Sequence, residues 1–234
     1  MQPLRLAITA AAALTFFGVM PRANAQDFGN VEVDQENFVL VAAPGGGLLG
    51  RPQFMIIEQK TNAQQCWGES ESIDQVPFID GSEAADESIN ELAASTVQIE
   101  PLLLNFNFSG ICGRSTDSNG YSIRTGDGDA GSSFNLEIKE QDGEYMLIGR
   151  PSSFPANPYR GSSPIYLGRT FGQANNGFTK IFLNSGWRLT RRSLDGRTLG
   201  HVYLTHDAPL GNLIAPNGGP TVKNPQVLAN PPLD

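Results

Sequence analysis

The sequence predicts a mostly β protein: an antiparallel β-sandwich or barrel-like domain with one short helix and one disulfide. Three observations predict it. Short segments alternate apolar and polar side chains, turns rich in Gly, Asn and Asp separate them, and a single stretch of the mature chain has clear helical spacing. Closely spaced strands without intervening helices favour antiparallel sheets over βαβ units.

The first 25 residues are typical of an export signal. Arg5 gives a basic start, residues 6–20 form an apolar run, and Ala-Asn-Ala at 23–25 fits the small-residue cleavage pattern. The run is shorter than the roughly 20 residues that a bilayer span needs, which disfavours the alternative of an uncleaved anchor. We therefore expect residues 26–234 to be exported to the periplasm, the cell wall or the outside of the cell, without a membrane span.

Residues 102–109 give the clearest strand signal. In the segment LLLNFNFS, apolar side chains alternate with Asn and Ser, as in a strand with one buried and one solvated face. The same alternation, continued, places Cys112 on the buried side. Two hairpins are expected, 134–139 with 145–149 and 187–193 with 198–205, because each pair flanks an Asp-Gly turn. The remaining predicted strands cover 37–43, 54–58, 165–170 and 178–183.

The best helix candidate in the mature chain is 83–94. Ala85, Ile89 and Leu92 fall at helical spacing, and Ser82 stands where it can cap the N-terminus. Its acidic residues suit the positive end of the helix dipole, so a solvated helix face explains them as well as a catalytic pair does.

The mature chain is expected to form a single β-rich domain, 26–206, and a tail. Residues 207–234 contain six prolines and few apolar anchors, which predicts disorder. Residues 26–149 carry 21 acidic and five basic residues, whereas 150–234 carry three acidic and nine basic. This asymmetry marks an interaction surface or, alternatively, two halves that neutralise each other within one domain. With 14 basic against 24 acidic residues, a net charge of −10, the exported chain is not expected to bind nucleic acid.

Cys66 and Cys112 are the only two cysteines. Outside the cytosol two lone cysteines most simply form one disulfide. The alternative is a free catalytic thiol, which needs a histidine as its base, and neither cysteine has a histidine nearby in the sequence.

Two further patterns suggest a cofactor or a metal. Gly45, Gly47 and Gly50 fit G-x-G-x-x-G, but a strand follows where the motif needs a helix, so no cofactor is expected. A loop with oxygen ligands makes calcium a weaker alternative, although the full calcium-loop pattern fails at two positions and Asn-Gly also favours a tight turn. The calcium candidates are Asp117, Asn119, Asp127 and Asp129.

The two histidines, His201 and His206, differ by an odd number of positions. On one strand they point to opposite faces, so they cannot chelate one metal ion. Each could act singly as a general base, but no G-x-S-x-G elbow supplies a serine nucleophile. We expect both to lie at the surface or to be satisfied by hydrogen bonds.

The final hairpin carries the best candidates for a ligand surface. Guanidinium groups hold carboxylates and phosphates through paired hydrogen bonds, and an exposed aromatic ring can stack on a sugar. The predicted ligand-binding residues are Arg188, Arg191, Arg192, Arg197, Trp187 and Tyr203. They suit an acidic polysaccharide, a wall polymer or an envelope protein. The alternative is internal pairing of the arginines with the acidic region 61–100.

Two long motifs carry a family resemblance. PLLLNFNFSGICGRSTDSNGYSIR (101–124) and GWRLTRRSLDGRTLGHVYLT (186–205) resemble an exported cyanobacterial family known as domain of unknown function 3747. FVLVAAP (38–44) and the Cys66-Trp67 pair fit it too, and the resemblance covers roughly 27–206. It implies an exported protein with the cysteine pair as a family feature. It brings no activity, cofactor or catalytic residue.

These observations predict a non-catalytic binding or structural component of the cell envelope or extracellular matrix. The alternative is a hydrolase of wall or extracellular polysaccharide that uses paired carboxylates from the acidic stretch. A cleft holding two carboxyl groups about 5–10 Å apart would favour the hydrolase. An open basic patch with Trp187 exposed would favour binding.

Overall fold

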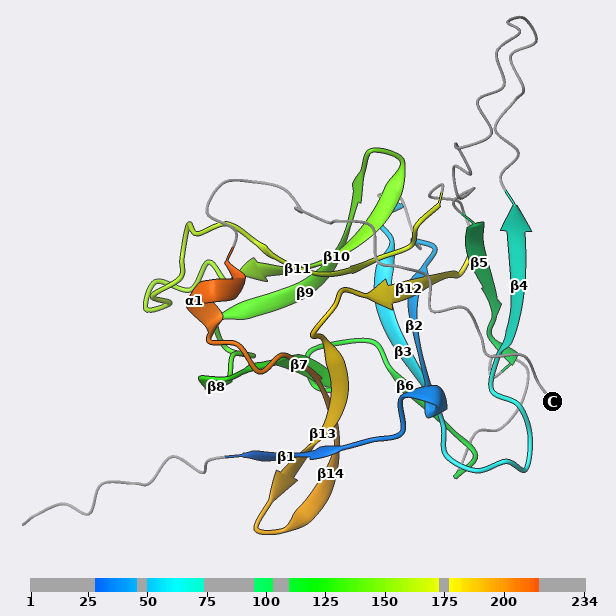
Figure 1. Cartoon of the computed structure of the whole chain (residues 1–234), viewed down its shortest axis with the longest axis horizontal. Coiled ribbons are helices and arrows are strands. Elements are labelled where there is room, and N and C mark those ends of the chain that lie inside the picture. Colours follow the sequence, from blue (N-terminus) through cyan, green and yellow to red (C-terminus); the bar gives the residue numbers. More distant parts are fainter. Residues whose placement is uncertain (1–27, 46–49, 74–94, 103–109, 173–176, 215–234) are drawn as a thin grey trace, which may run out of the picture.

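The structure is a computed structural model that describes residues 28–45, 50–73, 95–102, 110–172 and 177–214 (Figure 1). The predicted helix at 83–94 and most of the predicted strand at 102–109 lie outside these residues, as do the predicted signal and 215–234. The mostly β fold class is confirmed, because two sheets hold most of what is described.

The smaller sheet has five strands in the order β1-β13-β14-β7-β8. Its strands are β1 (Gly29–Glu32), β7 (Tyr121–Thr125), β8 (Gly128–Asp129), β13 (Arg188–Leu194) and β14 (Arg197–Thr205). Neighbours are antiparallel except β7 and β14, which run parallel with Tyr121 beside Val202. The sequence did not predict this parallel pair, because the two strands are far apart in the chain.

The larger sheet has nine strands, with seven in the order β6-β3-β2-β12-β11-β10-β9 and with β5 joining β12 to β4. In Figure 1 the β4–β5 pair stands beside β2 and β3. The strands are β2 (Phe38–Ala43), β3 (Gln53–Gln59), β4 (Gly68–Ile73), β5 (Ser95–Glu100), β6 (Cys112–Ser115), β9 (Phe134–Gln141), β10 (Glu144–Pro151), β11 (Ile165–Arg169) and β12 (Thr179–Leu183). A 3₁₀ turn, η1 (Gln35–Asn37), precedes β2 and is capped by the side chain of Asp34.

Both predicted hairpins are confirmed. β9 pairs with β10 across Asp142-Gly143, and β13 pairs with β14 across Asp195-Gly196. All four turn residues have positive φ, which glycine adopts freely and aspartate tolerates, and this backbone matches the twist of the flanking strands.

The main core lies between the two sheets. Ile123 of β7, Leu189 of β13 and Leu204 of β14 pack against Phe54 of β3 and Leu147 of β10 in one buried cluster. Their polar neighbours along the same strands therefore face away from this core, which places Ser122, His201 and Tyr203 on the outer face of the five-stranded sheet.

A second core covers the other face of β2 and β3. Val39, Val41 and Ile57 lie in one cluster with both cysteines. Because both faces of β2 are buried, its sequence is a continuous apolar run rather than an alternating one. The predicted disulfide is confirmed between Cys66 and Cys112, whose Cα atoms lie 5.8 Å apart.

The expected disorder from residue 207 onward is wrong for residues 207–214. They form a short helix, α1 (Leu210–Leu213), and Leu210 is buried in the main core. The backbone N–H of Leu210 donates to the carboxylate of Asp127 at 2.7 Å. Leu213 and Ile214 pack against the same core, and the backbone N–H of Gly126 donates to the carbonyl of Ala208 at 3.0 Å. Apolar and backbone contacts thus anchor a segment whose composition predicted a tail. Among the described residues no helix is long and apolar enough to cross a membrane.

Candidate functional site

The arginines of the final hairpin are held mainly by carboxylates of the same domain. The pairs are Arg188 with Glu32 and Asp207, Arg191 with Glu58, and Arg192 with Asp129. The hydrogen bond from Arg188 lowers the pKa of Asp207. Internal pairing is therefore what the structure contains, and the acidic partners among the described residues lie outside the expected region 61–100, of which 74–94 is not described. Arg197 alone of the four is exposed, at the start of β14 directly after the Asp195-Gly196 turn.

The aromatic residues expected at the ligand surface are buried. Trp187 is 9 % exposed, and its ring meets His206 edge-on at 5.2 Å between centroids. Tyr203 is 0 % exposed, and its hydroxyl donates to Asp129 at 2.8 Å. The expectation of an exposed ring beside the arginines is corrected: neither ring offers a face to a ligand.

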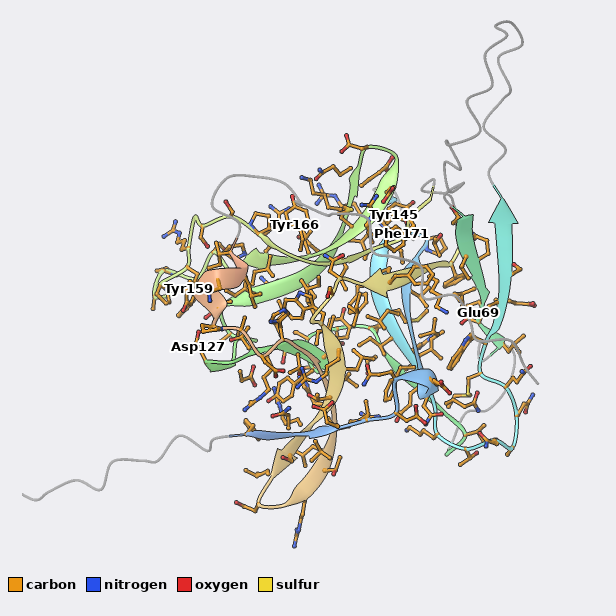
Figure 2. The ribbon with its side chains drawn as sticks, viewed as in Figure 1. Glu69, Asp127, Tyr145, Tyr159, Tyr166 and Phe171 are labelled. Carbon is orange, nitrogen blue, oxygen red and sulfur yellow. A yellow bond between two sulfur atoms is a disulfide. The ribbon has the colours of Figure 1, made fainter. Side chains whose placement is uncertain are left out.

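The carboxylate oxygens of the calcium candidates accept hydrogen bonds from the backbone or from other side chains. Asp117 accepts from the N–H of Asn119 at 2.9 Å, and Asp129 accepts from Arg192 and Tyr203. Asp127 lies beside α1, where it accepts from the backbone (Figure 2). The three carboxylates thus stabilise three separate local contacts. No group of three or more His, Cys, Asp or Glu side chains within the described ranges is arranged to hold a metal ion.

A serine and a histidine meet on the outer face of the five-stranded sheet. Ser122 Oγ lies 2.8 Å from Nε2 of His201, and Nδ1 of His201 lies 2.9 Å from the backbone carbonyl oxygen of Asn119. The carbonyl can only accept, so Nδ1 carries the proton and the neutral ring accepts from Ser122 through Nε2. Burial lowers the pKa of His201, which favours this neutral form.

Ser122 also lines a cleft of about 260 Å³ between β7 and the start of β9. Thr116, Asp117 and Ser118 give it a polar side, and Phe134 and Leu136 give it an apolar side. No Lys or Arg is among the residues that line it.

A second cleft, of about 390 Å³, lies beside the disulfide. We call it the Trp67 cleft, and its lining residues are Glu36, Gln59, Asn62, Gln64, Gln65 and Trp67. Five of these six have a carboxamide or an indole ring, and none is basic. The loop from Gln59 to Trp67 supplies all of them except Glu36.

That loop is fixed by contacts of its own. The side-chain carboxamide of Gln59 makes three hydrogen bonds to the loop backbone. Its Nε2 donates to the carbonyl oxygens of Thr61 at 2.5 Å and Gln64 at 2.6 Å, and its Oε1 accepts from the backbone N–H of Cys66 at 2.9 Å. Cys66 is tied to β6 through Cys112. Gln59 therefore closes the loop from inside, and the disulfide holds its far end.

The ring of Trp67 is oriented by a carboxylate. Its indole N–H donates to Glu69 at 3.2 Å, and Lys180 Nζ donates to the same carboxylate at 2.7 Å. Glu69 stands on β4, at the right of the molecule in Figure 2. Trp67 is partly buried against the second core, so one part of the ring is packed and another part lines the cleft.

Sequence reasoning missed both clefts. Ser122 and His201 stand at polar positions of alternating strands, but only the parallel pairing of β7 with β14 brings them together, and no local pattern predicts that pairing. The sequence contains a weak indication of the Trp67 cleft. A tryptophan follows a cysteine directly, after four positions rich in carboxamide side chains, Asn62 to Gln65.

Comparison with known proteins identifies a family. A family model described as a protein of unknown function (DUF3747) matches residues 5–81 and 75–209, which include both clefts and begin inside the predicted export signal. No curated protein and no solved structure matches the chain.

Proposed function

The chain belongs to the DUF3747 family of proteins of unknown function, and from that premise we propose that it is an exported component of the cell envelope or extracellular matrix that binds a neutral polysaccharide in the Trp67 cleft. The observation that carries the proposal is the fixed loop 59–67, which presents carboxamides and an indole ring to one hollow.

The lining residues suit the chemistry of a sugar. Hydroxyl groups both donate and accept hydrogen bonds, and a carboxamide offers an acceptor oxygen and two donor hydrogens to match them. The C–H face of a pyranose ring is apolar, and an indole is the largest flat apolar surface that a side chain can offer. Asn62, Gln64 and Gln65 supply the first kind of group, and Trp67 supplies the second.

The loop is organised before any ligand arrives. Gln59 spends both ends of its carboxamide on the loop backbone, and the disulfide anchors the residue next to Trp67. Binding then orders few additional groups, so less conformational entropy opposes it. The packing of Trp67 against the second core adds to the same effect.

The charge of the cleft favours a neutral ligand over the acidic polymer that the arginines suggested. Glu36 is the one ionised group among the lining residues, and it would repel a polyanion. A single carboxylate also favours binding over hydrolysis, since glycosidases of the two-carboxylate type need a pair.

Export and the envelope location rest on three supports. The N-terminal 25 residues have the pattern of a signal, the matched family model extends into it, and the chain carries a disulfide. A cyanobacterial origin, which the motifs at 101–124 and 186–205 suggest, belongs to the same proposal.

The test is a fluorescence titration with cellohexaose, maltohexaose, chitohexaose and, as an anionic probe, polygalacturonate. The chain has two tryptophans, and Trp187 is buried, so a change of emission reports on Trp67. We expect one neutral hexasaccharide to change the emission in a saturable manner. We expect no saturable change with polygalacturonate.

Binding measured by calorimetry with the same saccharide should weaken about fivefold in Trp67→Ala, since stacking on an aromatic ring contributes on the order of 1 kcal/mol. Arg197→Ala is the matched control, because it tests the alternative that the ligand binds at the arginines of the final hairpin, of which Arg197 is the exposed one. Equal binding by wild type and Trp67→Ala, or a loss of binding in Arg197→Ala alone, would place the contact surface elsewhere.

A further inference from the structure

The Ser122–His201 pair has the arrangement of a base-activated nucleophile. In such pairs the hydroxyl lies about 2.6–3.2 Å from the base, and a third group orients the base. Here the first distance is 2.8 Å, and the carbonyl of Asn119 fixes the tautomer from the other side of the ring at 2.9 Å. A neutral imidazole with its free lone pair on the serine is the form that accepts a proton.

The nucleophile has a place for a substrate beside it. Ser122 lines the cleft of about 260 Å³, and Gly131 lies directly against it. A Cβ at position 131 would lie 2.8 Å from Ser122 Cβ and 3.1 Å from Ser122 Oγ, so a larger residue there would crowd the hydroxyl. A volume of about 260 Å³ accommodates a short acyl group.

We infer that Ser122 is a nucleophile that takes the acyl group of a short, uncharged ester in this cleft, with His201 as its general base. Thr116, Ser118 and Asn135 are among the residues that line the cleft, and their side chains carry hydrogen-bond donors of the kind that suits an ester oxygen. Phe134 and Leu136 offer the apolar contact for the acyl chain. Asp117 is the one ionised lining residue, and it disfavours an anionic substrate.

The reaction balances with water as the second substrate. Ser122 Oγ bonds to the ester carbonyl carbon while its proton passes to Nε2 of His201. The bond from that carbon to the alkoxy oxygen then breaks, and the alcohol leaves with the proton from His201. Water, deprotonated by His201, attacks the acyl-serine, and the carboxylic acid leaves as the serine regains its proton.

This activity is separate from polysaccharide binding. The residues that line the two clefts have no member in common, and the Trp67 cleft lies at the disulfide loop. Trp67→Ala should therefore leave the serine chemistry unchanged, and Ser122→Ala should leave hexasaccharide binding unchanged. Each proposal can thus fail without the other.

The test is labelling with diisopropyl fluorophosphate, which phosphorylates activated serines and releases fluoride. Trypsin cleavage after Arg114 and Arg124 gives the peptide 115–124, which contains Ser115, Ser118 and Ser122, so fragment spectra must assign the modified residue. We expect the label on Ser122. We also expect slow release of 4-nitrophenol from 4-nitrophenyl acetate, lost in the labelled protein.

The rate of labelling should fall on the order of 100-fold in His201→Gln, since a general base contributes at least that factor. His206→Gln and Ser132→Ala are the matched controls and should label as wild type does. Thermal melts followed by circular dichroism establish that each variant is folded. Absence of label on Ser122 in the folded wild type would overturn the inference, as would an unchanged rate in folded His201→Gln.

Discussion

Arg191 of β13 forms an ion pair with Glu58 of β3, and this pair links the five-stranded sheet to the nine-stranded sheet. Both side chains are largely removed from solvent, at 12 % and 19 % exposed. The guanidinium also donates to the carbonyl of Gly200 and lies 5.5 Å from the ring of Phe38. The sheets are thus joined by a polar contact at the margin of their apolar core.

Removal of one partner of this pair should destabilise the fold strongly. In Glu58→Leu the guanidinium of Arg191 stays mostly buried without its counter-charge, which costs about 3 kcal/mol of unfolding free energy. Urea unfolding followed by fluorescence measures the loss.

Two further variants show whether the loss of unfolding free energy in Glu58→Leu comes from the unpaired buried charge. The double variant Arg191→Met/Glu58→Leu should recover most of it, because no unpaired charge remains. Arg150→Met breaks a pair of the same chemistry whose side chains are 61 % and 34 % exposed, and should cost less than about 1 kcal/mol. Equal losses in Glu58→Leu and Arg150→Met would contradict the structural role of the buried pair.

The disulfide should contribute more stability than any one of these ion pairs. Cys66 and Cys112 are separated by 46 positions. Closing a loop of that length lowers the conformational entropy of the unfolded chain, which raises the free energy of unfolding by about 4 kcal/mol. We expect the urea midpoint of the oxidised protein to fall on addition of dithiothreitol. The midpoint of Cys66→Ala/Cys112→Ala should be low from the start and should not respond to dithiothreitol.

Leu210 should behave as a core residue although it lies near the end of the chain. Leu210→Ala removes a buried side chain from the main cluster and should lower the unfolding free energy by about 2 kcal/mol. The exposed Asn212 on the same short helix is the matched control, and Asn212→Ala should change stability by less than about 0.5 kcal/mol. If both variants melt like wild type, α1 does not stabilise the domain.

Local patterns in the sequence predicted the local parts of the fold. The hairpins form where Asp-Gly turns lie between alternating strands, and the disulfide forms between the only two cysteines. The parallel contact of β7 with β14 depends on residues about 80 positions apart, such as Ser122 and His201, and no local pattern encodes it. The same limit explains the arginines: their clustering was visible in the sequence, but the identity of Glu58 and Asp129 as partners depends on which strands meet.

The Ser122–His201 pair on the outer face of the five-stranded sheet should also make the stability of the fold depend on pH. Burial lowers the pKa of His201, the hydrogen bond to Asn119 opposes that shift, and the charges of Arg192 and Arg191 add to it while Asp129 opposes it. The net direction is downward, so below the ordinary value of about 6.5 the unfolded chain binds a proton that the folded chain does not. The contribution of His201 to the free energy of unfolding is therefore fully present above about pH 6.5, and it is lost as the pH falls toward the lower pKa of the folded state. Melting temperatures at pH 7.5, 6.5 and 5.5 should decrease more steeply for wild type and His206→Gln than for His201→Gln, and equal slopes in all three would show that His201 is not held neutral by the fold.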